Sequence, residues 1–256
     1  MNPGGEPHEV LAGIPGFSAA RIVRSLSDGP TNRSFEVVLD SRRFVLRLDK
    51  PRAAELGRDR KAEKQICMML ASAGLAPEPV LFEPSEGVYL RPYLPGRAWS
   101  ADDLRDIENL RRLAALLRQV HGIPAAPHRF DPLAAARRYT EQLDTDGARE
   151  LLRTVEDAAS GLPEFTPALC HNDLVCQNIL ETDPLTLIDW EYAGAGDAMF
   201  DLAVVVEHHQ LDQQREADFL ASYVQSPPTA SQIYHLHAQR KFYASLLALW
   251  NLRVHG

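Results

Sequence analysis

The sequence predicts an α+β fold with two lobes, a small antiparallel sheet followed by a larger and mainly helical part. Near the start of the chain, three segments alternate apolar and polar side chains as half-buried strands do, at 21–27, 34–39 and 44–48. Later in the chain, apolar residues recur at helical spacing through the segment 102–121. A Leu94-Pro95-Gly96 break separates the two patterns.

This break divides the chain into two expected domains, residues 1–94 and residues 95–256. In the first domain we also expect a short leading helix, a longer helix after the third strand and two further strands, at 6–11, 54–73, 79–83 and 88–93. In the second we expect helices at 102–121, 132–143, 148–159, 202–209 and 212–223. A long last helix should begin near Thr229 or Ser231 and continue through Trp250.

Composition narrows the class of protein. Hydrophobic residues make up 45% of the 256 residues, which is enough to fill the cores of two lobes. The net charge is -8 and there is no basic tract, so nucleic acid is not an expected partner. There is no apolar run of membrane-spanning length, and the segment from Met1 to Pro7 is too polar for a signal peptide. We expect a cytoplasmic protein, and no obligate protein partner is evident.

One polar loop carries the chemistry. His171 is followed two residues later by Asp173, then by Asn178, and an apolar strand leads on to Asp189. A carboxylate can accept or orient the proton of an attacking hydroxyl, while a carboxamide and a second carboxylate are hard oxygen ligands for Mg²⁺ at nucleotide phosphates. This order of residues is that of the kinase catalytic loop and metal strand. The alternative, a chance turn rich in Asn and Asp, does not explain the strand and the second aspartate.

The segments HNDLVCQNIL and LIDWEYAGAGDAMFDLA resemble the choline/ethanolamine and thiamine kinase branch of the aminoglycoside-phosphotransferase-like kinases. The resemblance implies a two-lobed, protein-kinase-like fold that uses ATP and Mg²⁺ to phosphorylate a small molecule. It places Asp173 at the catalytic position and Asn178 and Asp189 at the metal. It also implies that His171 braces the loop and that Asp201 hydrogen-bonds the loop backbone.

The same resemblance suggests how the first domain binds the nucleotide. Gly29 and Asn32 are similar to a G-x-x-N segment of this family, which lies over the phosphates. Arg47 stands where protein kinases carry a lysine, and an arginine can also bind phosphates and pair with a helix carboxylate. Glu63 is the expected partner, with Glu55 as the competing choice.

Adenine needs one carbonyl and one N–H group at the edge of the last strand of the first domain. Pro92 and Pro95 have no N–H group, which leaves the Pro92 carbonyl and the Leu94 N–H as the expected pair.

We expect the acceptor to be a small alcohol, and the residues that should converge near Asp173 favour a cationic one. Only a short Gly/Ala segment separates Asp189 from Asp201, so the peptide platform of a protein kinase is missing. Carboxylates and aromatic faces would hold a fixed positive charge. The candidates are Glu191, Glu207, Tyr243 and Trp250, although aromatic residues at helical spacing also commonly belong to a core.

Three alternatives stay open from the sequence: an antibiotic phosphotransferase of the aminoglycoside type, a regulatory pseudokinase that binds nucleotide, and, more weakly, a protein kinase. The intact Asp173, Asn178 and Asp189 argue against the pseudokinase. The identity of the acceptor, the choice between ATP and GTP and the oligomeric state also stay open.

The cysteine of the loop and the histidines of the second domain are expected to have structural roles. Cys176 is expected to be a buried thiol, because no base is placed by the sequence to activate it. The nearby histidines of the second domain are expected to be solvated or packed rather than to bind a metal: His208, His209, His235 and His237.

Overall fold

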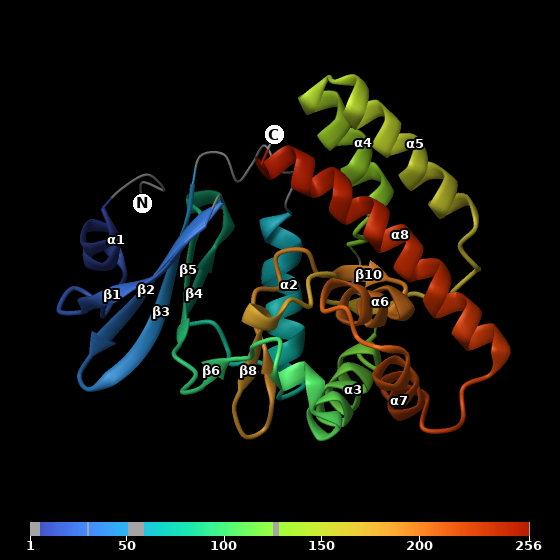
Figure 1. Ribbon diagram of the computed structural model, residues 1–256. Helices are drawn as coiled ribbons and strands as arrows, with labels where there is room; N and C mark the ends of the chain where they lie inside the picture. The colour runs from blue at the N-terminus through green and yellow to red at the C-terminus, as the bar shows by residue number, and fades with distance from the viewer. Residues whose placement is uncertain (1–5, 30, 51–58, 125–127, 256) are drawn as a thin grey trace. The chain divides into compact units, whose positions relative to one another are not determined.

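The computed structural model describes residues 6–29, 31–50, 59–124 and 128–255. The chain divides into two compact units, Met1–Gly96 and Arg97–Gly256. Figure 1 shows the sheet and α2 in the first unit and most of the helices in the second. Each unit is described separately.

The first unit is built on a five-stranded antiparallel sheet. Its elements are α1 (Pro7–Gly13), β1 (Arg21–Asp28), β2 (Asn32–Leu39), β3 (Arg42–Asp49), α2 (Arg60–Ser72), β4 (Leu81–Glu83) and β5 (Val88–Pro92). The strand order is β1-β2-β3-β5-β4, with every neighbouring pair antiparallel. The three alternating segments form the first three strands as predicted. β1 is nevertheless exposed along its whole length, so the expectation that it is half-buried is wrong, because it lies at the edge of the sheet.

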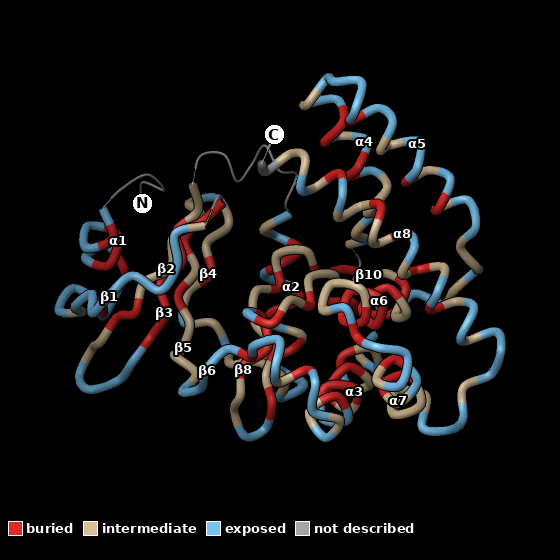
Figure 2. The backbone as a smooth tube through the Cα atoms, viewed as in Figure 1, coloured by how far each residue is buried: buried red, intermediate tan, exposed pale blue. Residues whose placement is uncertain are grey.

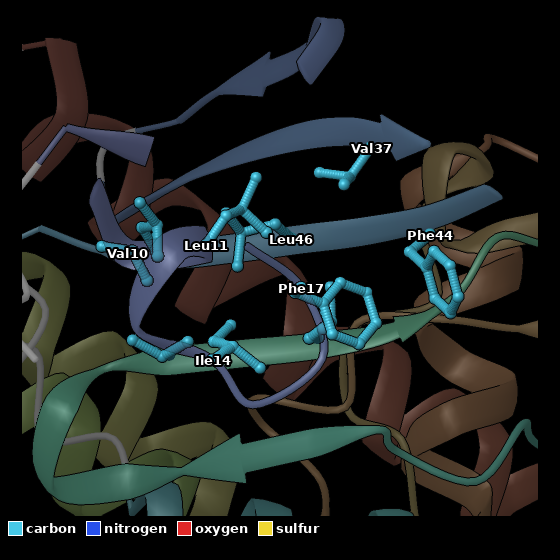
Figure 3. Packing of buried hydrophobic residues seen from close by; sticks show 10 residues of the cluster. Val10, Leu11, Ile14, Phe17, Val37, Phe44 and Leu46 are labelled. Carbon is cyan, nitrogen blue, oxygen red and sulfur yellow. The ribbon is translucent and has the colours of Figure 1, made fainter. Parts of the chain in front are cut away.

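A compact hydrophobic cluster joins α1 to this sheet (Figure 3). Val10, Leu11, Ile14 and Phe17 come from α1 and the turn after it, and Val37, Phe44, Leu46, Leu48, Val88 and Leu90 come from the strands. The rings of Phe17 and Phe44 meet edge to face, with centroids 5.0 Å apart. Each fully buried side chain of this kind contributes about 1.5–3 kcal/mol to folding, so the short α1 belongs to the core.

Helix α2 begins at Arg60 because Asp59 caps it. The Asp59 carboxylate accepts hydrogen bonds from the backbone N–H groups of Lys61 (3.0 Å) and Ala62 (2.9 Å). The prediction that this helix starts at residue 54, and the alternative ion-pair partner Glu55, lie outside the described residues.

The second unit is mainly helical. Its helices are α3 (Ile107–His121), α4 (Pro132–Leu143), α5 (Asp146–Ser160), α6 (Ala198–His208), α7 (Gln213–Val224) and α8 (Ala230–His255). Its short strands are β6 (Arg97–Ala98), β7 (Ala168–Cys170), β8 (Ile179–Glu181), β9 (Thr186–Leu187) and β10 (Gly194–Gly196). They form one pair, β10-β7, and one small sheet in the order β6-β8-β9.

The expected single helix over 102–121 is wrong at its start. Asp106 has extended backbone angles, φ -83° and ψ 123°, which divide a short 3₁₀ helix, Asp103–Arg105, from α3. The Asp106 carboxylate accepts a hydrogen bond from the Glu108 N–H at 2.9 Å, so it caps α3 instead of lying inside it. A local cap therefore overrides the helical spacing of the apolar residues.

Helix α6 is the buried centre of the second unit. It contains an uninterrupted run of buried residues from Phe200 to Val206 (Figure 2), and α8 packs along it. Its start at Ala198 precedes the expected start at Leu202, because Asp197 caps it by accepting from the Met199 N–H at 2.9 Å. Among the described residues, no helix combines the length and the apolar character that crossing a membrane requires.

Candidate active site

The loop between β7 and β8 is held by the buried carboxylate of Asp201 on α6. Asp201 accepts hydrogen bonds from the backbone N–H groups of His171 (2.8 Å) and Asn172 (2.7 Å), and His121 Nε2 lies 3.0 Å from it. Asn172 has a left-handed φ of 65°, a conformation that costs free energy in a non-glycine residue. Through these hydrogen bonds Asp201 stabilises the turn, so its predicted role at the loop backbone is confirmed.

His171 braces the same loop from within. Its Nδ1 accepts a hydrogen bond from the Asp173 N–H at 3.2 Å, and its Nε2 lies 2.9 Å from the carbonyl oxygen of Ile188. Both contacts are made at once when the proton is on Nε2. The predicted bracing role is confirmed, and it ties Asp173 to the strand that leads to Asp189.

Asn178 contacts Asp173, the expected catalytic residue, through its side chain and the segment before Asp189 through its backbone. Its Nδ2 donates to the Asp173 carbonyl at 2.9 Å and to Asp173 Oδ2 at 3.0 Å, so Oδ1 is its atom suited to a cation. Its backbone carbonyl accepts from the Ile188 N–H at 2.9 Å. Asp189 follows with a left-handed φ of 65°. The structure therefore brings Asp173, Asn178 and Asp189 to one place.

These oxygen donors fit a magnesium ion. Mg²⁺ prefers carboxylate and amide oxygens and keeps sites open for water and phosphate, which one carboxamide and one carboxylate allow. Asn178 and Asp189 would hold it, and the strained conformation of Asp189 is of the kind that functional sites maintain.

In the first unit, Arg47 and Glu63 form a buried ion pair. Arg47 Nη2 lies 2.8 Å from Glu63 Oε1, and the two residues are 6% and 2% exposed. The predicted pairing is confirmed. Sequence reasoning missed a second cation: Arg60 donates to Glu63 Oε2 at 2.6 Å and binds both carboxylate oxygens of Asp49 at 2.6 and 2.7 Å. Glu63 thus contacts two guanidinium groups, and Asp49 supplies the second carboxylate that balances their charge.

The other expected nucleotide contacts lie at strand ends. Asn32 is buried at the start of β2, where its carbonyl oxygen accepts from the Gly29 N–H at 3.0 Å. Pro92 ends β5, and its carbonyl accepts from Arg91 Nη1 at 3.1 Å, a contact that adenine would share or replace. Leu94 follows just after the strand. Nucleotide binding by these residues stays a prediction.

Changing Glu63 should weaken both the fold and the nucleotide site. Glu63→Gln leaves Arg47 and Arg60 without their shared buried carboxylate, and breaking a buried ion pair costs about 3–5 kcal/mol. We expect a lower free energy of unfolding in denaturant titration and a higher KM for ATP. Glu78→Gln, at an exposed position of the same unit, is the matched control. Equal stability of the two variants would contradict the account of Glu63.

On α6, the predicted substrate carboxylate Glu207 is already paired. Its Oε2 accepts from Arg240 Nε at 3.0 Å and from Nη2 at 2.8 Å. Arg240 Nη1 also donates to Glu216 Oε2 at 2.6 Å, and His237 Nε2 lies 2.7 Å from Glu216 Oε1. Two carboxylates therefore share one guanidinium group, and Glu216 also contacts an imidazole. Arg240 is a partner that sequence reasoning missed.

Tyr243 lies near the carboxylates of Asp173 and Glu207. Burial raises the pKa of the Tyr243 phenol, and the negative charges of Asp173 and Glu207 raise it further. Its hydroxyl is 2.8 Å from His208 Nδ1. The structure therefore brings Tyr243 and Glu207 within electrostatic reach of each other and links Tyr243 to Asp173.

The remaining two acceptor candidates are placed differently. Trp250 packs toward α4, with its ring centroid 5.4 Å from that of Tyr139 and the Arg253 guanidinium 5.8 Å from it. Glu191 is partly exposed, two residues beyond Asp189. Contact of either residue with an acceptor stays a prediction.

The four histidines expected to be solvated or packed have specific polar partners. His208 contacts Tyr243, His209 Nε2 lies 3.1 Å from the Leu174 carbonyl, and His235 Nε2 lies 2.6 Å from Asp197 Oδ2. Among the described residues, three side chains that could bind a metal ion lie close together: His121, Cys170 and Asp201. The Asp201 carboxylate in this group already accepts hydrogen bonds from the loop backbone.

Cys176 does have a base beside it, contrary to the sequence expectation. Its Sγ lies 3.5 Å from His209 Nδ1. Burial raises the pKa of the Cys176 thiol, and burial also lowers the pKa of His209, so both groups are held neutral. The pair therefore packs the loop and is not an activated nucleophile, as expected of a buried thiol.

Comparison with known proteins identifies the family. The phosphotransferase enzyme family matches residues 22–234 of this chain. The chain belongs to that family. Protein LicA of Haemophilus influenzae is 29% identical over 204 residues, which are 75% of this chain and 59% of that protein. The chain thus spans less than two thirds of that relative. The thiamine kinase of Shigella boydii is 31% identical over 212 residues, 77% of this chain and 70% of the kinase.

Three solved structures of other proteins share the fold. A choline/ethanolamine kinase family protein from Mesorhizobium loti has a TM-score of 0.77 at 24% identity, covering 96% of this chain and 84% of its own. Choline kinase LicA from Streptococcus pneumoniae has a TM-score of 0.79 at 20% identity, covering 96% and 88%. A structure of LicA in complex with AMP covers 97% and 91%, with a TM-score of 0.77 at 19% identity. The predicted family and α+β, kinase-like fold class are confirmed.

Proposed function

We propose that this chain is an ATP- and Mg²⁺-dependent kinase that phosphorylates the hydroxyl group of a small cationic alcohol, of the choline, ethanolamine or thiamine kind. The observation that carries the proposal is the Asn178 side chain, which bonds Asp173 through its Nδ2 at 3.0 Å while Asp189 follows in a left-handed conformation. The carboxylate that would receive the proton of the acceptor hydroxyl, on Asp173, therefore lies beside the oxygen ligands that would bind a cation, on Asn178 and Asp189. A cytoplasmic location, where ATP is abundant, is part of the proposal.

In this mechanism the protein acts mainly by positioning. Asp173 orients the acceptor hydroxyl and receives its proton, while Asn178 holds Asp173 in place and His171 fixes the loop. When bound, Mg²⁺ neutralises charge on the transferred phosphoryl group. Arg47 and the other residues of the first unit would bind the nucleotide. We assign the adenine contact to Pro92 and Leu94 and a phosphate-side contact to Asn32.

The charges on the second unit favour a cationic acceptor. Glu207 and Asp173 both place negative charge near Tyr243, and Arg240 is shared between Glu207 and Glu216. Aromatic faces such as that of Tyr243 attract quaternary ammonium groups by about 0.5–2 kcal/mol each. We extend this acceptor surface to Glu191 and Trp250. Aminoglycosides are also cationic, so an antibiotic phosphotransferase is the second candidate.

A panel of alcohols tests the proposal. ADP formation should be measured with choline, ethanolamine, thiamine, homoserine, a methylthio-sugar and kanamycin as acceptors. We expect choline, ethanolamine or thiamine to give the highest turnover above the rate without acceptor. Highest turnover with kanamycin would favour the antibiotic phosphotransferase. ATP binding without turnover of any acceptor would favour a regulatory pseudokinase.

Removing the charge of Glu207 should affect the acceptor more than the nucleotide. Glu207→Gln should raise the KM of choline about threefold to tenfold, because a partly buried charge acts across a moderate dielectric, and should leave the KM of ATP nearly unchanged. Glu216→Gln is the matched control, since it removes another carboxylate from Arg240 but does not act on Tyr243. Equal effects of the two substitutions on choline KM would argue against a direct role of Glu207.

A further inference from the structure

The pair of His208 and Tyr243 is not used by the mechanism above. His208 ends α6 and Tyr243 lies on α8, and these two helices pack together (Figure 1). The Tyr243 hydroxyl is 2.8 Å from His208 Nδ1. The Tyr243 ring also meets Phe200 edge to face, with centroids 5.9 Å apart, so its orientation is fixed at both ends.

The direction of this hydrogen bond decides whether the Tyr243 oxygen keeps its lone pairs for a ligand. A phenol is a stronger donor than a neutral imidazole N–H group, so neutral His208 accepts the phenol proton at Nδ1 and carries its own proton on Nε2. The lone pairs of the Tyr243 oxygen then remain for a second partner. A protonated His208 would instead donate to that oxygen and would add a positive charge beside it.

We propose that His208 and Tyr243 form a positioning pair for the acceptor, in which neutral His208 keeps the Tyr243 oxygen turned toward a cationic alcohol near Asp173. This inference rests on the proposed function. It adds that protonation of His208 weakens binding of the acceptor in acid, by reversing the hydrogen bond and by charge repulsion.

Burial favours a neutral His208, whereas nearby negative charges alone would favour its protonated form. His209, the residue that follows α6, is in ring contact with His208, with centroids 4.9 Å apart, and burial lowers the pKa of both histidines below the usual value. The acidic groups around Tyr243 are Asp173 and Glu207, and Arg240 on α8 is bound to Glu207 and Glu216. With a lowered pKa, His208 takes up its proton only below about pH 6.5, so the loss of acceptor binding falls in that range.

The experiment measures the KM of choline and of ATP between pH 5 and pH 8. In the wild-type protein, choline KM should rise about threefold or more as the pH falls from 7.5 to 5, as a single titrating histidine allows. His208→Asn retains a polar atom near the position of Nδ1 but does not titrate, so most of this rise should be lost. Tyr243→Phe keeps the ring but removes the phenol oxygen, and it should raise choline KM about twofold to fivefold at pH 8 without a matching change for ATP, because the N-methyl groups of choline lose a weak C–H···O contact.

His8→Asn, which removes an exposed histidine of the first unit, is the control and should retain the wild-type profile. A wild-type profile in His208→Asn, or an unchanged choline KM in Tyr243→Phe, would overturn the pair while leaving the kinase assignment intact. Absence of turnover with choline and all other alcohols would instead contradict the proposed function.

If His208→Asn does not fold, NMR titration of the wild-type histidine rings replaces it. Saturating choline should shift the His208 midpoint to lower pH, because a bound cation opposes protonation, and an unchanged midpoint would overturn the inference.

Discussion

Asp173→Asn should lower kcat about 10²–10⁴-fold, the range expected when a general base is removed. The carboxamide is nearly the same size and leaves the backbone bonds of the loop to Asp201 and Asn178 in place, but it cannot take the proton of an acceptor hydroxyl. Binding of ATP should be retained, since Asp173 is placed on the acceptor side. Steady-state turnover and calorimetric titration with nucleotide measure the two properties separately.

The matched control is Asp157→Asn, an exposed aspartate on α5, which should keep wild-type turnover. Turnover near the wild-type level in Asp173→Asn would place the proton transfer on another residue. Loss of nucleotide binding together with turnover would mean that Asp173 acts at the metal or the phosphates.

Asp189→Ala should abolish the dependence of nucleotide binding on Mg²⁺. Asp189 supplies a carboxylate at the end of the strand that Asn178 and His171 hold through Ile188. Asn178→Ala should weaken MgATP binding and raise the Mg²⁺ concentration that half-maximal turnover requires, because one of two oxygen ligands is lost. Titration with ATP in the presence of Mg²⁺ and then of EDTA checks both variants.

The two substitutions should also differ in kcat. Asn178→Ala removes the 3.0 Å contact to Asp173 Oδ2 and so should lower kcat even at saturating Mg²⁺. Nucleotide affinity that ignores Mg²⁺ in the wild-type protein, or that both variants retain, would contradict the metal assignment.

The sequence predicted those parts of the site that depend on local order. Asp201 and His171 act within the loop motif and on its neighbouring helix, and the structure confirms both roles. The Arg47 and Glu63 pair was predictable because the strand and helix that carry them are consecutive in the chain. By contrast, Arg60 was not included, since its contact with Asp49 depends on how α2 begins.

Contacts between distant helices could not be read from the sequence. Glu207 was assigned to substrate without Arg240, because that pairing depends on the register of α8 against α6. The same register decides the contact of His208 with Tyr243, and the loop packing that brings His209 to Cys176 is equally non-local. The start of α3 was misplaced for a different reason: the capping side chain of Asp106 outweighs apolar periodicity.

Phosphorus NMR of a reaction that contains the protein, MgATP and an acceptor from the panel tests the central claim most directly, because it identifies the atom that receives the phosphoryl group. The account predicts that the γ-phosphate signal is replaced by ADP and by an equal amount of a phosphomonoester of choline, ethanolamine or thiamine, and that Asp173→Asn gives almost none. Release of ADP with inorganic phosphate alone, or no consumption of ATP with any alcohol, would contradict it.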